Sequence, residues 1–133
     1  MDEIAKGSLS PSALMEESLA RIAAINPKIN AIVALRDEAA LMDEARAMDA
    51  APLKGPLHGL PFAVKDLVAT KGITSNWGSP IFKDFVPSKD DLLAARLRAA
   101  GAILIGKTNV PEFGLGSHSF NPIYGITKNP YDL

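Results

Sequence analysis

The sequence predicts an α/β fold, and three observations support this prediction. Apolar residues recur at helical spacing in the N-terminal third, as at Met15 and Leu19. Two short apolar runs, residues 60–64 and 102–105, have the length and composition of buried strands. A helical segment, residues 88–100, directly precedes the second run. A helix followed at once by a buried strand is half of an α/β layer.

Two helices are expected before the first strand. Ser10 can cap the first helix, and Pro11 then occupies its first turn, where a missing N–H is no loss. The pair Asn26-Pro27 is expected to end this helix, because proline disfavours helical geometry in the residue before it. The second helix is expected over residues 37–50, which are rich in alanine and glutamate. Residues 29–35 suit either a strand or a helical linker.

Residues 1–133 are interpreted as part of one domain, with a helical lead-in over residues 1–50 and an α/β part over residues 51–133. Glycine and proline at residues 51–59 mark turns between the two parts. Residues 110–133 are rich in Gly, Pro, Asn and Ser and contain no closing helix or strand. Such a long structureless end indicates an incomplete domain.

The third helix shows its boundaries in the sequence. Ser88 and Asp91 form a capping box at its start, and Gly101 suits its C-terminal end. Leu93 and Leu97, followed by Ala100, are expected to form its apolar stripe.

Composition limits the classes of partner. The net charge is −1 over 133 residues, without the dense basic patch that nucleic acids or anionic membranes require. There is no cysteine and there are two histidines, so no metal site is expected. No apolar run approaches the roughly 20 residues of a membrane span, and the N-terminus lacks a signal-peptide pattern. A cytoplasmic location is therefore expected.

Residues Gly101 to Thr108 match the phosphate-loop pattern Gly-x4-Gly-Lys-Thr. That loop requires a strand before its first glycine and a helix after its threonine. Here a helix precedes Gly101, the middle residues are β-prone, and Pro111 follows closely. Nucleotide binding at this segment is therefore a minor alternative.

A Ser-His-Asp group built from His58, Asp66 and a serine such as Ser117 is a second weak hypothesis. The sequence has no Gly-x-Ser-x-Gly elbow to present the serine. His58 lies in a segment rich in glycine and proline and is expected at the surface.

Lys65 is the strongest candidate for chemistry. The apolar run at residues 60–64 brings it to the end of a strand, where ligands of open α/β sheets bind. A lysine that loses water there can serve as a general base in its neutral form. On these residues alone, a solvated Lys65 or one paired with Asp66 is the favoured interpretation.

Four segments resemble the amidase signature family. They are residues 55–66 (GPLHGLPFAVKD), 96–109 (RLRAAGAILIGKTN), 111–113 (PEF) and 121–132 (NPIYGITKNPYD). Each segment is modest evidence alone, and the four in this order and spacing are specific. The helical N-terminus is also similar to the family's opening helices.

This resemblance implies the N-terminal part of a large α/β/α fold around a mixed sheet. The family hydrolyses or transfers carboxamides through a serine–serine–lysine triad, without a metal or cofactor. Lys65 matches the triad lysine, which is the general base. Gly114, Leu115 and Gly116 match a loop that lines the acyl side of the site and are candidate substrate contacts. Asp66 is a candidate partner that orients Lys65.

The chain departs from the family in one respect. Both family serines lie in Gly/Ser-rich motifs shortly after Asn-Pro-Tyr-Asp, and this sequence ends at Leu133 before either motif. None of its own serines lies in a Gly-Gly-Ser-Ser setting. We therefore expect no amidase activity from the chain alone, because a nucleophile and the oxyanion groups are missing. We also expect marginal stability, or association with a complementing C-terminal chain or with further copies.

Two other classes of function remain open. One is a non-catalytic binding or interaction module in which Lys65 is structural, and the other is the nucleotide site at Gly101–Thr108. Within the amidase hypothesis the small-molecule substrate is also open. The family acts on small aliphatic or aryl amides, fatty amides, peptide amides, or glutamine that feeds a tRNA-linked transfer.

Overall fold

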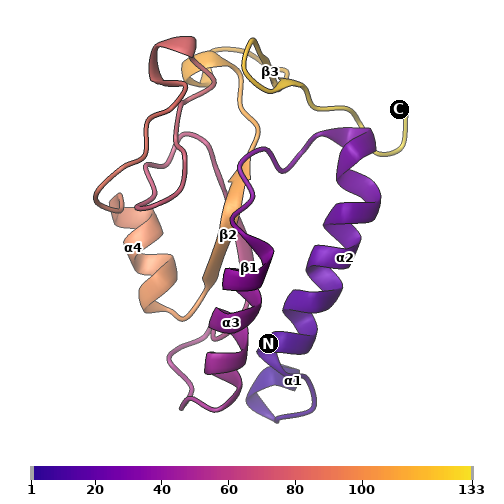
Figure 1. Cartoon of the computed structure of the whole chain (residues 1–133), viewed down its shortest axis with the longest axis vertical. Helices are drawn as coiled ribbons and strands as arrows, with labels where there is room; N and C mark the ends of the chain where they lie inside the picture. The colour runs from indigo at the N-terminus through magenta and orange to yellow at the C-terminus, as the bar shows by residue number, and fades with distance from the viewer. Residues whose placement is uncertain (1, 133) are drawn as a thin grey trace.

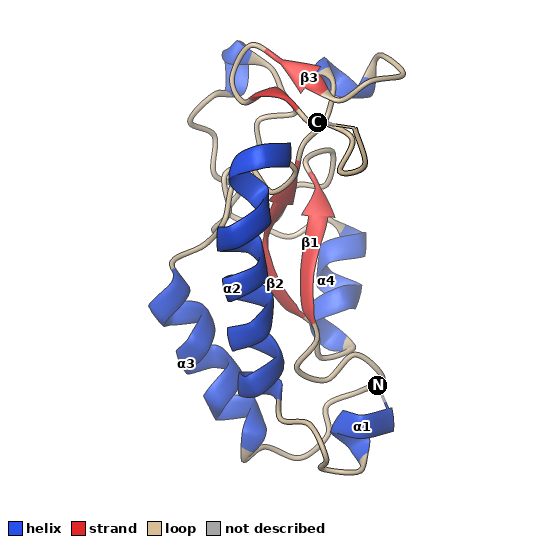
Figure 2. Ribbon diagram, turned by 90° about the vertical axis from the view of Figure 1, so that its right-hand side faces the viewer, coloured by secondary structure: helices blue, strands red, loops and turns tan. Residues whose placement is uncertain are grey.

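The structure, a computed structural model, describes residues 2–132 and has three layers. Two parallel strands, β1 (Pro61–Lys65) and β2 (Ile103–Thr108), form the central layer. Helices α2 (Pro11–Ile29) and α3 (Glu38–Asp49) cover one face, and α4 (Leu92–Ala99) covers the other (Figures 1 and 2). This α/β arrangement confirms the predicted fold class.

The other elements are short. They are α1 (Asp2–Ala5), η1 (Pro80–Phe82), η2 (Glu112–Gly114), β3 (Phe120–Asn121) and β4 (Gly125–Ile126). The last two form a small antiparallel pair, which is separate from the central sheet. The two 3-10 turns and β3 lie at the end of the molecule toward which β1 and β2 point (Figures 1 and 2).

The core has one apolar cluster on each face of the sheet, as the alternation of side chains along β2 requires. The cluster under α2 and α3 consists of Met15, Leu19, Leu41, Ala45, Ile103 and Ile105. The cluster under α4 consists of Val64, Ile73, Ala94, Ala102 and Leu104. Because both faces are covered, β2 is buried along nearly its whole length, as its run of apolar residues predicts.

Helix α2 is longer than predicted, because it continues through Pro27 to Ile29. A proline this close to the end removes only one hydrogen bond of the last turn. Asn30 then closes the helix with a left-handed backbone, φ 53°, and its N–H donates to the Asn26 carbonyl at 2.7 Å. The side chain of Asn26 accepts hydrogen bonds from the following loop and so fixes the exit of the chain.

The segment after α2 is neither of the predicted alternatives. Residues 30–36 form a loop that follows one edge of β2. Ile32 forms an isolated antiparallel bridge with Thr108, and the N–H of Val33 donates to the Lys107 carbonyl at 3.0 Å. The loop thus covers one edge of β2, whereas the outer edge of β1 is paired with no strand within residues 2–132.

The capping box predicted before α4 is wrong. Asp91 is itself the N-cap residue, and its carboxylate accepts from the Ala69 N–H at 2.8 Å rather than from its own helix. The predicted stripe is also wrong in part, because Leu93 is 53% exposed and Ala94 is the buried residue of α4. Gly101 does end the helical segment with a positive φ of 98°, as predicted.

Candidate functional site

Lys65 is the last residue of β1 and lies opposite Thr108 in the parallel pair. Its side chain is exposed, which leaves it accessible to a ligand. The N–H of Asp66 donates to the Thr108 carbonyl at 3.1 Å, so the backbone remains tied to β2 just past the lysine. The strand therefore brings Lys65 to the carboxyl end of the sheet, as the sequence predicts.

Asp66 is fully buried and points away from solvent. One carboxylate oxygen, Oδ2, accepts from the Asn76 N–H at 3.3 Å, and the other, Oδ1, lies 3.8 Å from Lys107 Nζ. Burial raises the pKa of Asp66 above its usual value, while the Lys107 ammonium and the backbone N–H groups of Asn76, Gly78 and Trp77 act in the opposite direction. The ion-pair partner of Asp66 is thus Lys107, not the neighbouring Lys65.

The sequence suggests a site role for Lys107 only within the phosphate-loop pattern at residues 101–108. Lys107 lies in the strand β2 with its side chain fully buried, and its ammonium donates to the Val68 carbonyl. Burial lowers its pKa, and the charge of Asp66 opposes this effect. The sequence did hold a signal, because a lysine within a strand buried on both faces must find an interior partner.

The same position of Lys107 excludes the phosphate-loop hypothesis. Residues 103–108 are strand β2, so they do not form a loop around a phosphate, and η2 starts only at Glu112. The lysine of the pattern is paired inside the protein. Gly106 is needed for another reason, because a Cβ there would lie 2.4 Å from the Ala34 carbonyl oxygen.

A tight turn at residues 76–78 lies beside Asp66. Trp77 and Gly78 both have positive φ angles, 54° and 67°. The Trp77 carbonyl accepts from the Phe113 N–H at 2.8 Å, which ties the turn to η2. The tryptophan ring stacks on Phe85 with ring centroids 5.5 Å apart.

The predicted substrate loop follows this contact directly. Phe113 has a left-handed backbone, φ 52°, and Gly114, Leu115 and Gly116 come next. Leu115 is 81% exposed, and a Cβ on Gly114 would lie 3.0 Å from a methyl group of Leu67. Lys65 ends β1, and the loop follows η2 at the end of the molecule toward which β1 and β2 point (Figure 1).

Three buried asparagines fasten the segments at this end. Asn121 donates to the Asn109 side chain at 2.7 Å and to the Val110 carbonyl at 2.9 Å. Its own oxygen accepts from the Tyr124 N–H at 2.8 Å. The Tyr124 hydroxyl in turn accepts from the Asn76 side chain at 2.8 Å. The network therefore connects the turn at residues 76–78 with the C-terminal segment.

The structure does not assemble the Ser-His-Asp group. His58, predicted at the surface, is only 3% exposed, with Nδ1 accepting from the Lys54 N–H and Nε2 facing the Met48 carbonyl at 3.0 Å. It thus fastens the segment before β1, at the opposite end of the strand from Asp66. Ser117 does contact a histidine, the neighbouring His118, at 2.9 Å, but both are exposed.

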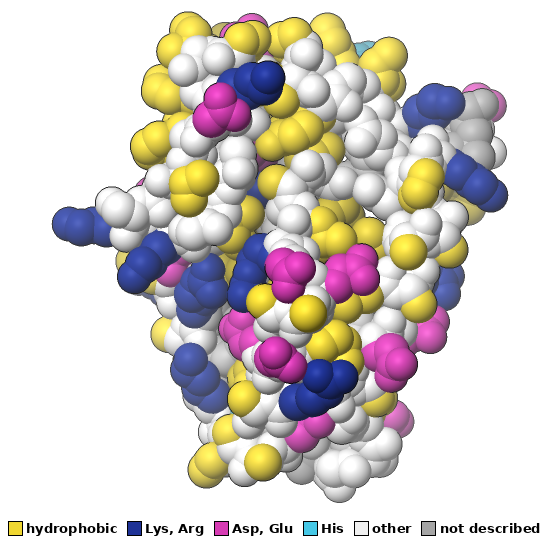
Figure 3. Space-filling view, viewed as in Figure 1, with side chains coloured by type: hydrophobic (Ala, Val, Ile, Leu, Met, Phe, Trp, Pro, Cys, Tyr) yellow, Lys and Arg dark blue, Asp and Glu magenta, His cyan; other side chains and the backbone are white. Residues whose placement is uncertain are grey.

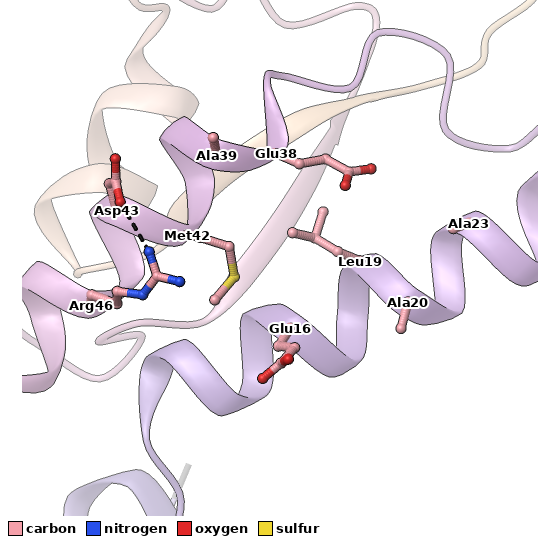
Figure 4. A pocket seen from close by; sticks show the side chains of 9 residues that line it. All are labelled: Glu16, Leu19, Ala20, Ala23, Glu38, Ala39, Met42, Asp43 and Arg46. Carbon is pink, nitrogen blue, oxygen red and sulfur yellow. Dashed lines mark hydrogen bonds and ion pairs between the residues drawn. The ribbon is translucent and has the colours of Figure 1, made fainter.

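A groove of about 430 Å³ lies between α2 and α3 (Figure 4), and none of its lining residues belongs to β1 or β2. Its walls are Glu16, Leu19, Ala20, Ala23, Glu38, Ala39, Met42, Asp43 and Arg46. Arg46 is paired with Asp43 on its own helix at 3.1 Å, as the dashed line in the figure marks. Its lining contains no serine, threonine, histidine or lysine, so the groove is not the candidate site.

Neither a metal cluster nor a membrane-spanning helix is found within residues 2–132. No group of three or more histidine or carboxylate side chains in this part of the chain could hold a metal ion. None of its helices is long and apolar enough to cross a membrane.

A sequence profile of the Amidase family matches residues 13–133. The chain belongs to the amidase family. It is 44% identical to a glutamyl-tRNA(Gln) amidotransferase subunit from Nitratidesulfovibrio vulgaris (strain DP4), over 98% of this chain and 27% of that protein. It is 39% identical to an acylamidase of Rhodococcus erythropolis, over 98% of this chain and 28% of the relative. The chain thus spans between a quarter and a third of the length of these relatives.

Solved amidase structures have the same fold. A 6-aminohexanoate cyclic dimer hydrolase with bound substrate superposes with a TM-score of 0.86 at 30% identity, over 99% of this chain and 27% of that one. The peptide amidase bound to chymostatin superposes with a TM-score of 0.85 at 34% identity, over 98% of this chain and 28% of that one. The family and fold predicted from the four sequence segments are thereby confirmed.

Proposed function

We propose that this chain is the N-terminal part of a serine–serine–lysine amidase and that Lys65 is its general base. The observation that supports this proposal is the position of Lys65, which is exposed at the carboxyl end of β1. A base must reach the proton that it removes, and an accessible amine at a sheet's carboxyl end meets this condition. The loss of water that favours a neutral lysine would come from the further segment of the complete protein, which would cover Lys65. The reaction class is hydrolysis or transfer of a small-molecule carboxamide.

Two further roles belong to this proposal. Gly114, Leu115 and Gly116 line the acyl side of the site, since they lie beyond the same strand ends as Lys65. Asp66 orients Lys65 through the backbone, because its N–H holds the chain to Thr108 and its buried carboxylate prevents the residue from turning outward. In this proposal the nucleophile and the relay serine lie in a further segment of the complete protein. The complete protein is proposed to be cytoplasmic.

The first experiment is to determine the length of the native gene product by intact mass and by the coding sequence after Leu133. A product that continues through two Gly/Ser-rich motifs is then assayed against aliphatic, aryl and peptide amides and glutamine. Lys65→Ala should lower kcat/KM by about 10²–10⁴-fold, the usual contribution of a general base. Lys54→Ala is the matched control, because Lys54 is exposed at the opposite end of β1 and should leave turnover unchanged.

Three results would contradict the proposal. Turnover by Lys65→Ala close to that of the wild type would exclude the lysine as base. Amide hydrolysis by residues 1–133 alone would show that the serines supplied by this chain suffice. A gene product that ends at Leu133 would instead favour the non-catalytic binding module.

A further inference from the structure

Lys107 has no part in the proposed function, although it forms a buried pair with Asp66, the residue that directly follows Lys65. Both side chains are 0% exposed, and their charged atoms are 3.8 Å apart. Burial of two charges is unfavourable unless each has partners. Asp66 Oδ1 has no hydrogen-bond partner besides this ionic contact. Removal of the lysine would therefore leave a buried carboxylate without compensation.

The carboxylate has a second contact, with the turn at residues 76–78. Asp66 Oδ2 accepts from the Asn76 N–H, and the N–H groups of Trp77 and Gly78 also favour its charged form. The Gly78 N–H donates to the Asn76 side-chain oxygen at 2.9 Å, so Asn76 links the carboxylate to the part of the turn that has positive φ angles. Turns whose N–H groups converge in this way bind anions. The carboxylate thus acts as the internal anion that holds this turn.

The same turn holds the loop that is proposed to line the acyl site. The Trp77 carbonyl accepts from the Phe113 N–H, the residue just before Gly114. The turn also packs closely on the segment that follows β2, because a Cβ added to Gly78 would lie 3.0 Å from the Val110 carbonyl oxygen. A displacement of the turn would therefore move residues 113–116.

We propose that Lys107 is a positioning residue for the amidase site. It balances the buried charge of Asp66, the Asp66 carboxylate holds the turn at residues 76–78, and the turn sets the place of Gly114, Leu115 and Gly116 relative to Lys65. This inference rests on the proposed function for its catalytic consequence. Its structural part, the link from Lys107 to the turn, is tested on this chain independently of activity.

Trp77 is the only tryptophan of the chain, so its fluorescence reports the turn directly. Lys107→Met, which keeps the length of the side chain and removes the charge, should shift the Trp77 emission to the red and make it more accessible to acrylamide. The helix content by circular dichroism should stay that of the wild type. Lys54→Met is the matched control, because Lys54 is exposed and remote, and its spectrum should not change.

The double variant Asp66→Asn/Lys107→Met separates positioning from mere stability and serves if Lys107→Met fails to fold. It contains no buried charge, so its melting temperature should return toward that of the wild type. A neutral amide holds backbone N–H groups less strongly than a carboxylate does. The altered Trp77 emission should therefore persist in the double variant. Full recovery of the wild-type emission would overturn the proposal, as would an unchanged spectrum in folded Lys107→Met.

In the complete enzyme, Lys107→Met should lower kcat/KM by about 10²-fold, since a misplacement of about 1 Å has such an effect. Most of the change should appear in KM, because the loop contacts the substrate and the base remains in place. Wild-type turnover in Lys107→Met would overturn the catalytic part. A wild-type product without amidase activity would instead refute the proposed function and leave the Trp77 result to stand alone.

Discussion

Lys107 occupies the last buried position of β2, after a run of apolar residues, and its pairing with Asp66 makes this position possible. Burial moves the two pKa values in opposite directions, upward for the carboxyl and downward for the ammonium. Each charge counters the shift of the other. Asp91 also favours the charged form of the lysine. If one member of the pair is replaced, the pKa of the remaining member should therefore shift further in the direction that burial favours.

Asp66→Asn should make stability depend more strongly on pH. Without the carboxylate, the pKa of Lys107 should fall further below 10.5, because Asp66 is the largest influence that raises it. Between the lowered pKa and 10.5 the unfolded chain binds more protons than the folded chain, so the free energy of unfolding rises with pH. The variant should thus be weakest near neutral pH and recover part of its stability toward about pH 9, below the usual range of tyrosine ionisation.

Melting temperatures of the variant and the wild type over this pH range provide the measurement. Asp84→Asn is the control, because Asp84 is exposed and its curve should run parallel to that of the wild type. A constant difference between Asp66→Asn and the wild type at every pH would show that the ammonium of Lys107 does not depend on Asp66.

At this scale the sequence predicts positions along a strand better than it predicts partners. Lys65 lies at the predicted strand end, because an apolar run of known direction fixes where the next residue emerges. The partner of Asp66 could not be found in this way, since Lys107 is distant in the sequence and lies in a segment that suggests a phosphate loop. The neighbours of His58 predict a surface position, yet its ring is buried and hydrogen-bonded to the backbone of Lys54 and Met48.

Among the elements, β2 combines the most constraints, because helices cover both faces and the loop at residues 30–36 covers one edge. The loop backbone approaches β2 so closely at Gly106 that a Cβ would lie 2.4 Å from the Ala34 carbonyl oxygen. Gly106 has no positive φ, so the need for glycine there is purely steric. Helix α3 begins just after this loop, and the loop is hydrogen-bonded to β2, so it connects the layer of α2 and α3 with the sheet.

Gly106→Ala should therefore destabilise the chain by about 3 kcal/mol, the upper end of the usual cost of overpacking. Gly72→Ala is a matched control, since a Cβ there meets nothing within 4 Å and only its φ of 75° is unfavourable. That change should cost about 1 kcal/mol. Urea unfolding monitored by circular dichroism measures both values. Equal destabilisation by the two variants would mean that the loop moves away from β2 without loss.

Helices α2, α3 and α4 and both strands of the central sheet followed from periodicity and turn chemistry, because those signals are local, whereas α1 was not predicted. The exceptions are segments that depend on long-range contacts. The loop at residues 30–36 has strand-like composition, but its hydrogen bonds go to β2 at irregular spacing. Asp91 has the sequence features of a capping-box residue, and its carboxylate instead reaches Ala69 on another segment. Local patterns contain no information on such partners.

At the scale of the whole molecule, the apolar surface is distributed unevenly. Figure 3 shows hydrophobic side chains over the loops at the end toward which the strands point, and charged side chains mainly over the lower helical part. Ile81 and Leu115 are 78% and 81% exposed. A second apolar groove, of about 350 Å³, lies between α2 and the sheet beside Pro61 and Ile105. It borders β1, whose outer edge is unpaired within residues 2–132.

These surfaces predict that the 133-residue chain associates in solution. An unpaired strand edge accepts further strands, and a contiguous apolar patch binds its like. Sedimentation velocity should show a mass that rises with concentration, and the melting temperature should rise with it. Ile81→Ser should weaken this association, whereas Leu53→Ser should not, because Leu53 is 59% exposed but lies before β1 at the other end of the sheet. A monomer with a sharp melting transition at every concentration would show instead that the open edge and the apolar loops tolerate water, and that the three layers of this chain suffice for a stable domain.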